Sequence, residues 1–246
     1  MKVGFTSTSL RKYSINLVVD AAAKCGAKAI EWGTDYHIKS DKDALLAKEL
    51  CDEKGIEIRS LGSYYRIGSG KFEEFEKICS LAKTMGAAYI RTWLGTKGSE
   101  KTDDKEYSAL IDESLKLSEI AAKYGVIISN ECHPNTFNDT LTSSLKYLDD
   151  TDGKIKTYYQ SWYKDRAGDF EKLNALLPFV SDVHISFSEL KKFQKFHKKD
   201  ESFIPDIISE LKKSDFNGCI FIEFTSGDKA ENLISDIKKI QVMVNE

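Results

Sequence analysis

Short apolar runs alternate with longer amphipathic stretches along almost the whole chain. The stretches between the runs carry apolar residues at helical spacing, as in SINLVVDAAAKCG, and several close on a glycine that can take the left-handed conformation of a helix end. The apolar runs predict strands, which we place at residues 2–7, 29–33, 56–63, 89–95, 126–133, 156–161, 180–186 and 219–224.

Alternating strands and helices predict a parallel sheet. The 246 residues contain no Gly/Ser linker or change of composition that would mark a domain boundary. We therefore expect one α/β domain spanning residues 1–246, a closed (β/α)8 TIM barrel with its helices outside, because such barrels usually have ~250 residues. A doubly wound open sheet is the alternative, but no GxGxxG motif follows the first strand.

Composition limits the classes of function. The chain is 41% hydrophobic and 30% charged, which is typical of a globular protein, and its net charge of -3 offers no general attraction for nucleic acid. We find no signal peptide and no run of the roughly 18 to 20 apolar residues that a membrane span needs, and so expect a cytoplasmic protein. The five cysteines are scattered and never form CxxC, which indicates reduced thiols in the core. The Lys-rich run at 191–199, with His197, is expected to be a solvated loop or helix face.

The stretch YGVIISNECHPN carries a carboxylate and an imidazole to the end of a predicted strand. Side chains alternate faces along a strand, so Glu131 and His133 point the same way. The C-terminal strand ends hold the active site of a TIM barrel. This pair is therefore expected at the catalytic mouth.

Each of the last four predicted strands places one oxygen or nitrogen donor at an equivalent position. Two carboxylates that converge in one buried mouth repel each other, whereas a divalent cation neutralises both. Any one of these donors could instead be satisfied by Arg59, Arg91 or the backbone, but four at matching places favour a metal site for Mn2+, Zn2+, Co2+ or Mg2+. The predicted ligands are Glu131, Gln160, His184 and Glu223.

Several segments together resemble a known family along the whole chain. They are GAKAIEWG, GSYYRIG, GAAYIRTWLG, NECHPNT, TYYQSW and FIEF, in this order. Their order and spacing are similar to the xylose-isomerase-like TIM-barrel superfamily of sugar and sugar-phosphate isomerases and epimerases. The resemblance implies a divalent metal held by Glu131, His184 and Glu223. Gln160 takes the remaining ligand place by position only, because this chain lacks the DxxH motif that the epimerase branch has near strand six.

The resemblance also implies an enzymatic mechanism. The metal would bind a substrate carbonyl and its neighbouring hydroxyl, and Glu131 and Glu223 would remove and return a proton through an enediolate. The substrate would be a ketose, a sugar phosphate or a related polyol. Residues expected to bind it are His133 and Arg91 through hydroxyl groups, Arg66 through a phosphate, and Trp32 and Tyr65 by stacking.

Other functions stay open at this point. A metal-dependent dehydratase of a keto-inositol or similar compound would begin with the same proton abstraction and then expel a hydroxyl. A non-catalytic sugar-binding barrel would need no metal. A DNA-repair endonuclease of the same superfamily would need a cluster of many histidines, and the chain has four. No nucleic acid or membrane partner is expected, and a homo-oligomer is possible.

Overall fold

The structure is a computed structural model that describes residues 1–161, 165–187 and 202–246. The Lys-rich run at 191–199 with His197, and Trp162 of the TYYQSW segment, lie outside the described residues.

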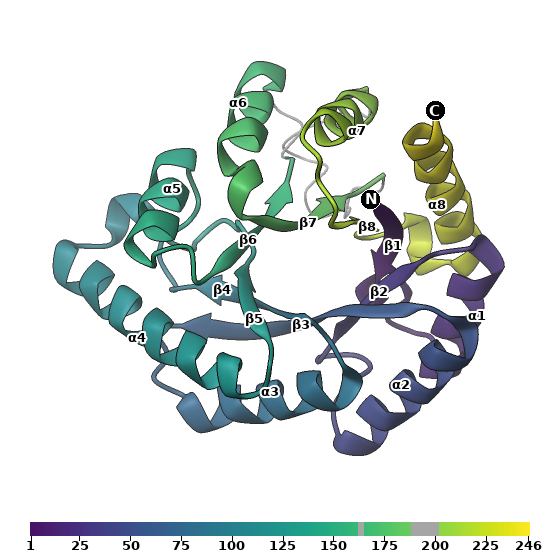
Figure 1. The fold of residues 1–246 in the computed structure, drawn as a ribbon, viewed down its shortest axis with the longest axis horizontal. Coiled ribbons are helices and arrows are strands. Elements are labelled where there is room, and N and C mark those ends of the chain that lie inside the picture. The colour runs from purple at the N-terminus through teal and green to yellow at the C-terminus, as the bar shows by residue number, and fades with distance from the viewer. Residues whose placement is uncertain (162–164, 188–201) are drawn as a thin grey trace.

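Eight parallel strands form a closed barrel, which confirms the predicted fold and excludes the open sheet (Figure 1). Each strand pairs with the next in chain order, and β1 pairs with β8 to close the ring. The strands are β1 (Lys2–Thr6), β2 (Ala29–Gly33), β3 (Glu57–Ile67), β4 (Tyr89–Leu94), β5 (Ile127–Asn130), β6 (Lys156–Gln160), β7 (Val180–Ile185) and β8 (Cys219–Ile222).

Helices follow the strands and ring the barrel (Figure 1). Gly26, Gly55 and Gly86 end the first three helices with positive φ, as the sequence predicts. The helices are α1 (Ile15–Cys25), α2 (Asp41–Lys54), α3 (Phe72–Met85), α4 (Asp104–Lys123), α5 (Leu141–Asp150), α6 (Arg166–Leu176), α7 (Phe203–Lys213) and α8 (Ala230–Asn245).

Strands β5 and β8 end earlier than the apolar runs suggest. The backbone pairing nevertheless continues for one residue, because the Glu131 N–H donates to Thr92 O (3.0 Å) and the Glu223 N–H donates to Ile185 O (2.8 Å). Phe224 then takes a φ of 62°, which takes the chain out of the extended conformation. The two glutamates therefore keep the orientation of strand residues although they stand just beyond the strands.

Apolar side chains fill two regions. A small cluster of Ala29, Tyr158, Cys219 and Phe221 packs separately from the larger core, to which the helices contribute their buried faces. All five cysteines are buried and free, as expected for core thiols.

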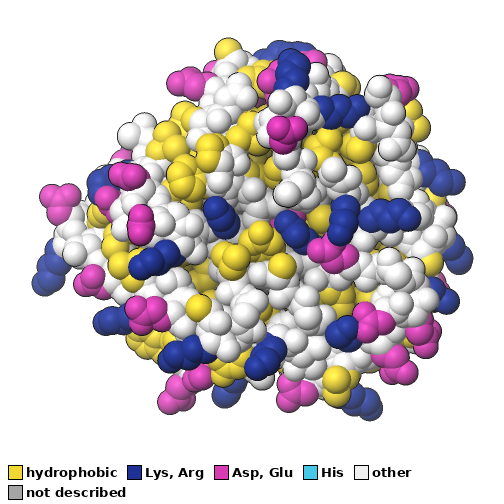
Figure 2. Space-filling view, viewed as in Figure 1, with side chains coloured by type: hydrophobic (Ala, Val, Ile, Leu, Met, Phe, Trp, Pro, Cys, Tyr) yellow, Lys and Arg dark blue, Asp and Glu magenta, His cyan; other side chains and the backbone are white. Residues whose placement is uncertain are grey.

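Positive and negative side chains are interspersed on the face shown in Figure 2, with hydrophobic side chains between them. That face therefore offers no single-sign surface of the kind that binds a phosphate backbone. Within the described part of the chain, no helix has the length and apolar character needed to cross a membrane.

Gly4 of β1 lies very close to the backbone of β2. A Cβ at this position would lie 2.1 Å from the backbone oxygen of Ala29 and 3.1 Å from the Phe221 ring. We expect Gly4→Ala to lower the free energy of unfolding by about 3 kcal/mol, since backbone cannot move aside as a side chain can. Gly98→Ala, whose Cβ would meet only the Asp139 side chain, is the matched control. Urea unfolding measures both, and equal losses would contradict this account of β1 packing.

Candidate metal centre

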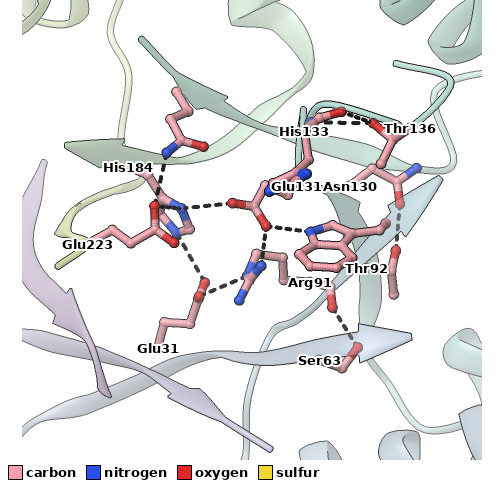
Figure 3. Close-up of polar contacts among 12 residues, drawn as sticks. Glu31, Ser63, Arg91, Thr92, Asn130, Glu131, His133, Thr136, His184 and Glu223 are labelled. Atoms are coloured by element: carbon pink, nitrogen blue, oxygen red, sulfur yellow. Dashed lines mark hydrogen bonds and ion pairs between the residues drawn. The ribbon is translucent and has the colours of Figure 1, made fainter. Parts of the chain in front are cut away.

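Three side chains converge at the C-terminal mouth of the barrel. Glu131 follows β5, His184 lies on β7 and Glu223 follows β8. All three are buried, and one ligand atom from each lies within 4.8 Å of the others. Figure 3 shows them facing one another across the mouth.

Glu131 is held by two donors on one oxygen. Arg91 Nη1 and Trp93 Nε1 both donate to Oε2, the latter at 2.6 Å. Burial would raise the pKa of Glu131, but the Arg91 guanidinium and His184 bring it below its ordinary value. The carboxylate is therefore kept ionised, with Oε1 left facing the centre.

Glu223 has a different environment. Its Oε2 accepts a hydrogen bond from Gln160 Nε2 at 2.9 Å, and this donor is neutral. Burial and the negative charge of Glu131 raise the pKa of Glu223, against an opposing effect of His184. The two carboxylates are thus chemically unequal.

A third buried carboxylate, Glu31 on β2, joins the centre, although the sequence analysis gave it no role as ligand, base or substrate contact. Its Oε1 accepts from Arg91 Nε at 3.0 Å, and its Oε2 accepts from Ser60 Oγ at 3.0 Å. Burial would raise the pKa of Glu31, but Arg91 and His184 lower it below the ordinary value. The sequence contained an indication, an acidic residue inside the apolar strand AIEWG whose side chain faces the same way as Ala29.

His184 is surrounded by these carboxylates. Neither ring nitrogen makes a well-formed hydrogen bond within the described residues. Nε2 lies 3.4 Å from Glu31 Oε2, while Nδ1 lies 3.7 Å from Glu223 Oε2 and 3.9 Å from Glu131 Oε1. Burial would lower the pKa of His184, but the carboxylates, Glu31 foremost, raise it to about 9.

The residues present fit a divalent cation. Arg91 and the protonated ring of His184 balance two of the three glutamate charges, so one remains in a buried site where uncompensated charge is costly. The His184 nitrogens are buried without hydrogen bonds in the described structure, and imidazole and carboxylate are common ligands of Zn2+ and Mn2+. Gln160 Oε1 is a further oxygen donor beside Glu223.

Among the residues predicted to bind substrate, the structure brings three near the centre. Arg91 bridges Glu31 and Glu131. His133 stacks on the Trp93 ring with 4.7 Å between ring centroids, and the Arg66 guanidinium lies 4.4 Å from the centre of the same ring. The Trp93 ring therefore packs against both His133 and Arg66, and its Nε1 donates to Glu131.

The other two predicted substrate residues, Trp32 and Tyr65, are not brought to the mouth. Trp32 belongs to the larger core and contacts His37 edge-on. Tyr65 packs against Phe75 of α3, and its hydroxyl contacts Glu113 of α4. Both point out of the barrel, because they alternate in the strand with inward-facing residues.

Removal of the histidine tests the metal centre. We expect the protein to bind one Zn2+ and His184→Ala to weaken that binding by at least ~100-fold, because loss even of an outer partner of a ligand costs 10- to 100-fold. His133→Ala is the control, since His133 stands outside the converging set. Calorimetric titration measures both, and unchanged affinity in His184→Ala would place the metal elsewhere.

The raised pKa of His184 gives Zn2+ binding a definite pH dependence. With a pKa of about 9, the metal-free ring is protonated at neutral pH and must lose a proton before it can bind a cation. Affinity should therefore rise with pH, by roughly tenfold per unit until about pH 9. Titration in buffers of different ionisation enthalpy measures the released proton. A constant affinity between about pH 6 and pH 8 would contradict this.

Comparison with known proteins gives three relevant similarities. A 3-dehydroshikimate dehydratase of Bacillus anthracis is 27% identical over 198 residues, which cover 75% of this chain and 71% of the relative. The crystal structure of a D-psicose 3-epimerase superposes with a TM-score of 0.79 at 13% identity, covering 100% of both chains. The IolI protein, crystallised with a bound zinc atom, has a TM-score of 0.79 at 20% identity and covers 100% of this chain and 98% of its own.

The family model described as "Xylose isomerase-like TIM barrel" matches residues 19–241, which is most of the chain. This match agrees with the closed eight-stranded barrel and with the resemblance found in the sequence. The protein belongs to the xylose isomerase-like TIM-barrel family.

Proposed function

We propose that this protein is a divalent-metal-dependent dehydratase that removes water from a small cyclic hydroxyketone. The buried centre of Glu131, His184 and Glu223 is the site that we assign to the metal. When bound, a divalent cation supplies positive charge where negative charge develops on the substrate's carbonyl oxygen.

The unequal bonding of the two carboxylates carries the proposal. Oε2 of Glu131 accepts hydrogen bonds from a guanidinium and an indole. These donors make Glu131 a weak base, which suits it to hold a metal and not to remove a proton. Within the described residues, Oε2 of Glu223 accepts one hydrogen bond, from the neutral amide of Gln160, and His184 Nδ1 lies 3.7 Å away. An elimination needs one base, whereas epimerisation through two glutamates needs two. One strong and one weak base favour elimination.

Proton movements can be assigned to this chain's own residues. Glu223 accepts the proton from the carbon beside the carbonyl. His133 Nδ1 contacts the Pro134 carbonyl oxygen at 2.9 Å and must be the donor there, so Nε2 is free to exchange a proton. Protonated His133 gives that proton to the leaving hydroxyl as the C–O bond breaks, and water departs. Glu223 returns its proton to solvent, from which His133 is reprotonated.

The dehydratase of Bacillus anthracis supports this choice of reaction. Its substrate, 3-dehydroshikimate, combines a ring ketone, hydroxyl groups and a carboxylate. Arg66 has no carboxylate partner among the described residues and stacks on Trp93, close to Glu131. We assign to Arg66 the binding of a substrate carboxylate at the rim, in the place where the sequence suggested a phosphate.

The second candidate is the epimerase or isomerase of a ketose. It is favoured by the placement of Glu131 and Glu223 near the same nitrogen of His184, at 3.9 and 3.7 Å from Nδ1. Two carboxylates around one bound cation could remove and return a proton. The D-psicose 3-epimerase shares this fold, so the barrel is compatible with epimerisation.

Dehydration of 3-dehydroshikimate by the Zn2+- or Mn2+-loaded protein tests the proposal. Mass spectrometry should detect loss of one water. We expect Glu223→Gln to lower kcat by at least ~100-fold with some metal binding retained, because the base is removed but an oxygen donor remains. Glu131→Gln should mainly weaken metal binding.

Incubation with D-psicose and D-fructose in D2O is the parallel assay for the second candidate. If deuterium enters these ketoses and 3-dehydroshikimate is not dehydrated, the dehydratase proposal is wrong and the epimerase candidate takes its place. Equal kcat in Glu223→Gln and the unsubstituted protein would eliminate Glu223 as the base, and His133 would then be the next to test.

A further inference from the structure

We propose that Glu31 is the positioning residue of the metal-binding histidine: it fixes the ring of His184 so that Nε2 carries the proton and Nδ1 faces Glu131 and Glu223. This inference rests on the metal site proposed above. It adds a residue from β2 that faces Nε2 of His184, whereas the two proposed carboxylate ligands are nearest to Nδ1.

The two edges of the imidazole face different carboxylates. Nε2 is nearest to Glu31 Oε2, at 3.4 Å, and Nδ1 is nearest to Glu223 and Glu131. Figure 3 shows Glu31 below the ring, with Glu223 to its left and Glu131 to its right. Only Nδ1 therefore faces both proposed carboxylate ligands.

Glu31 is well placed to hold the ring because it is itself immobilised. Arg91 Nε donates to Oε1 and Ser60 Oγ donates to Oε2, both at 3.0 Å. The absence of a side chain at Gly62 makes room for this arrangement, since a Cβ there would lie 3.0 Å from both Arg91 Nη2 and Glu31 Oε1. The carboxylate is 1% exposed, so water does not compete for it.

A carboxylate at this place selects one form of the neutral ring. If Nε2 were unprotonated, its lone pair would face the negative Oε2 of Glu31 in a buried site, which is repulsive. With a proton on Nε2 the same contact is attractive, and the lone pair of Nδ1 is left for the cation. Metal-binding histidines commonly use such a carboxylate to fix ring orientation and tautomer.

Arg91 extends the support to a second proposed ligand. The guanidinium donates to Glu31 through Nε and to Glu131 through Nη1, and Trp93 adds a further donor to Glu131. The orientation of His184 and that of Glu131 thus depend on one buried cation. Arg91 acts here through the two glutamates.

Glu31→Gln is a sharp test because the amide has only one acceptor. Arg91 can only donate, so the amide oxygen must remain in the place of Oε1, which puts the NH2 group in the place of Oε2, facing Nε2. The variant should therefore favour the opposite tautomer. We expect Zn2+ affinity to fall ~10- to 100-fold by calorimetry. Nitrogen-15 spectra of the metal-free protein at about pH 10, where the ring is neutral, should show the Nε2–H signal of His184 in the unsubstituted protein and its loss in Glu31→Gln.

Three further variants test whether the effect comes from Glu31. Ser60→Ala removes one of the two donors that hold Glu31 and leaves Arg91 in place, so it should lower Zn2+ affinity less than Glu31→Gln does. Trp93→Phe removes a donor from Glu131 alone and should leave the Nε2–H signal intact. Glu31→Ala serves if Glu31→Gln does not fold: it removes the acceptor that holds the proton on Nε2, so the Nε2–H signal should weaken.

The outcomes separate this inference from the proposed function. If the unsubstituted protein binds no Zn2+, the metal site and the role of Glu31 both fail. If it binds Zn2+ but Glu31→Gln keeps its affinity and the Nε2–H signal, the role of Glu31 is wrong and the metal site stands.

Discussion

The centre depends on one buried cation, Arg91, between two buried carboxylates. Glu31 and Glu131 would each be expensive to bury as an ion alone, and the shared guanidinium makes their burial possible. Burial by itself would lower the pKa of Arg91, but Glu131 and Glu31 raise it well above the ordinary value, so the cation is permanent. Removal of one partner from such a buried pair costs about 3–5 kcal/mol. Arg91 therefore holds Glu31 and Glu131 in place at the barrel mouth before any ligand binds.

This arrangement gives the two carboxylates next to His184 different chemistry. Arg91 and Trp93 donate to one oxygen of Glu131, whereas the hydrogen bond to the Glu223 carboxylate in the described structure comes from the Gln160 amide. A symmetric pair of bases would suit proton removal and return on opposite sides of a substrate. The observed asymmetry suits one-directional proton removal, which is why we place dehydration ahead of epimerisation. Both reactions would share the same barrel and the same cation.

The sequence predicts the barrel well, because alternation of strand and helix patterns is repeated eight times and the strand ends must meet at one rim. It also predicts the donors that converge at the C-terminal ends of β5, β7 and β8, since each is a polar residue at the same end of its strand. It gives no role to Glu31. The ion pair of Glu31 on β2 with Arg91 on β4 spans β3, where Ser60 and Gly62 leave room for it, and a linear pattern does not show such a contact. Trp32 and Tyr65 mislead for a related reason: aromatics near a strand end serve the outer core equally well, and only the side-chain alternation of the folded strand decides.

Anomalous diffraction from crystals grown with Zn2+ is the most direct test of this account. It predicts one ion at the mouth, about 2.0–2.2 Å from Glu131 Oε1, His184 Nδ1 and a Glu223 oxygen, with Arg91 still bridging Glu31 and Glu131. An ion bound through Nε2 of His184, an ion at another place, or an Arg91 released from both glutamates would contradict it.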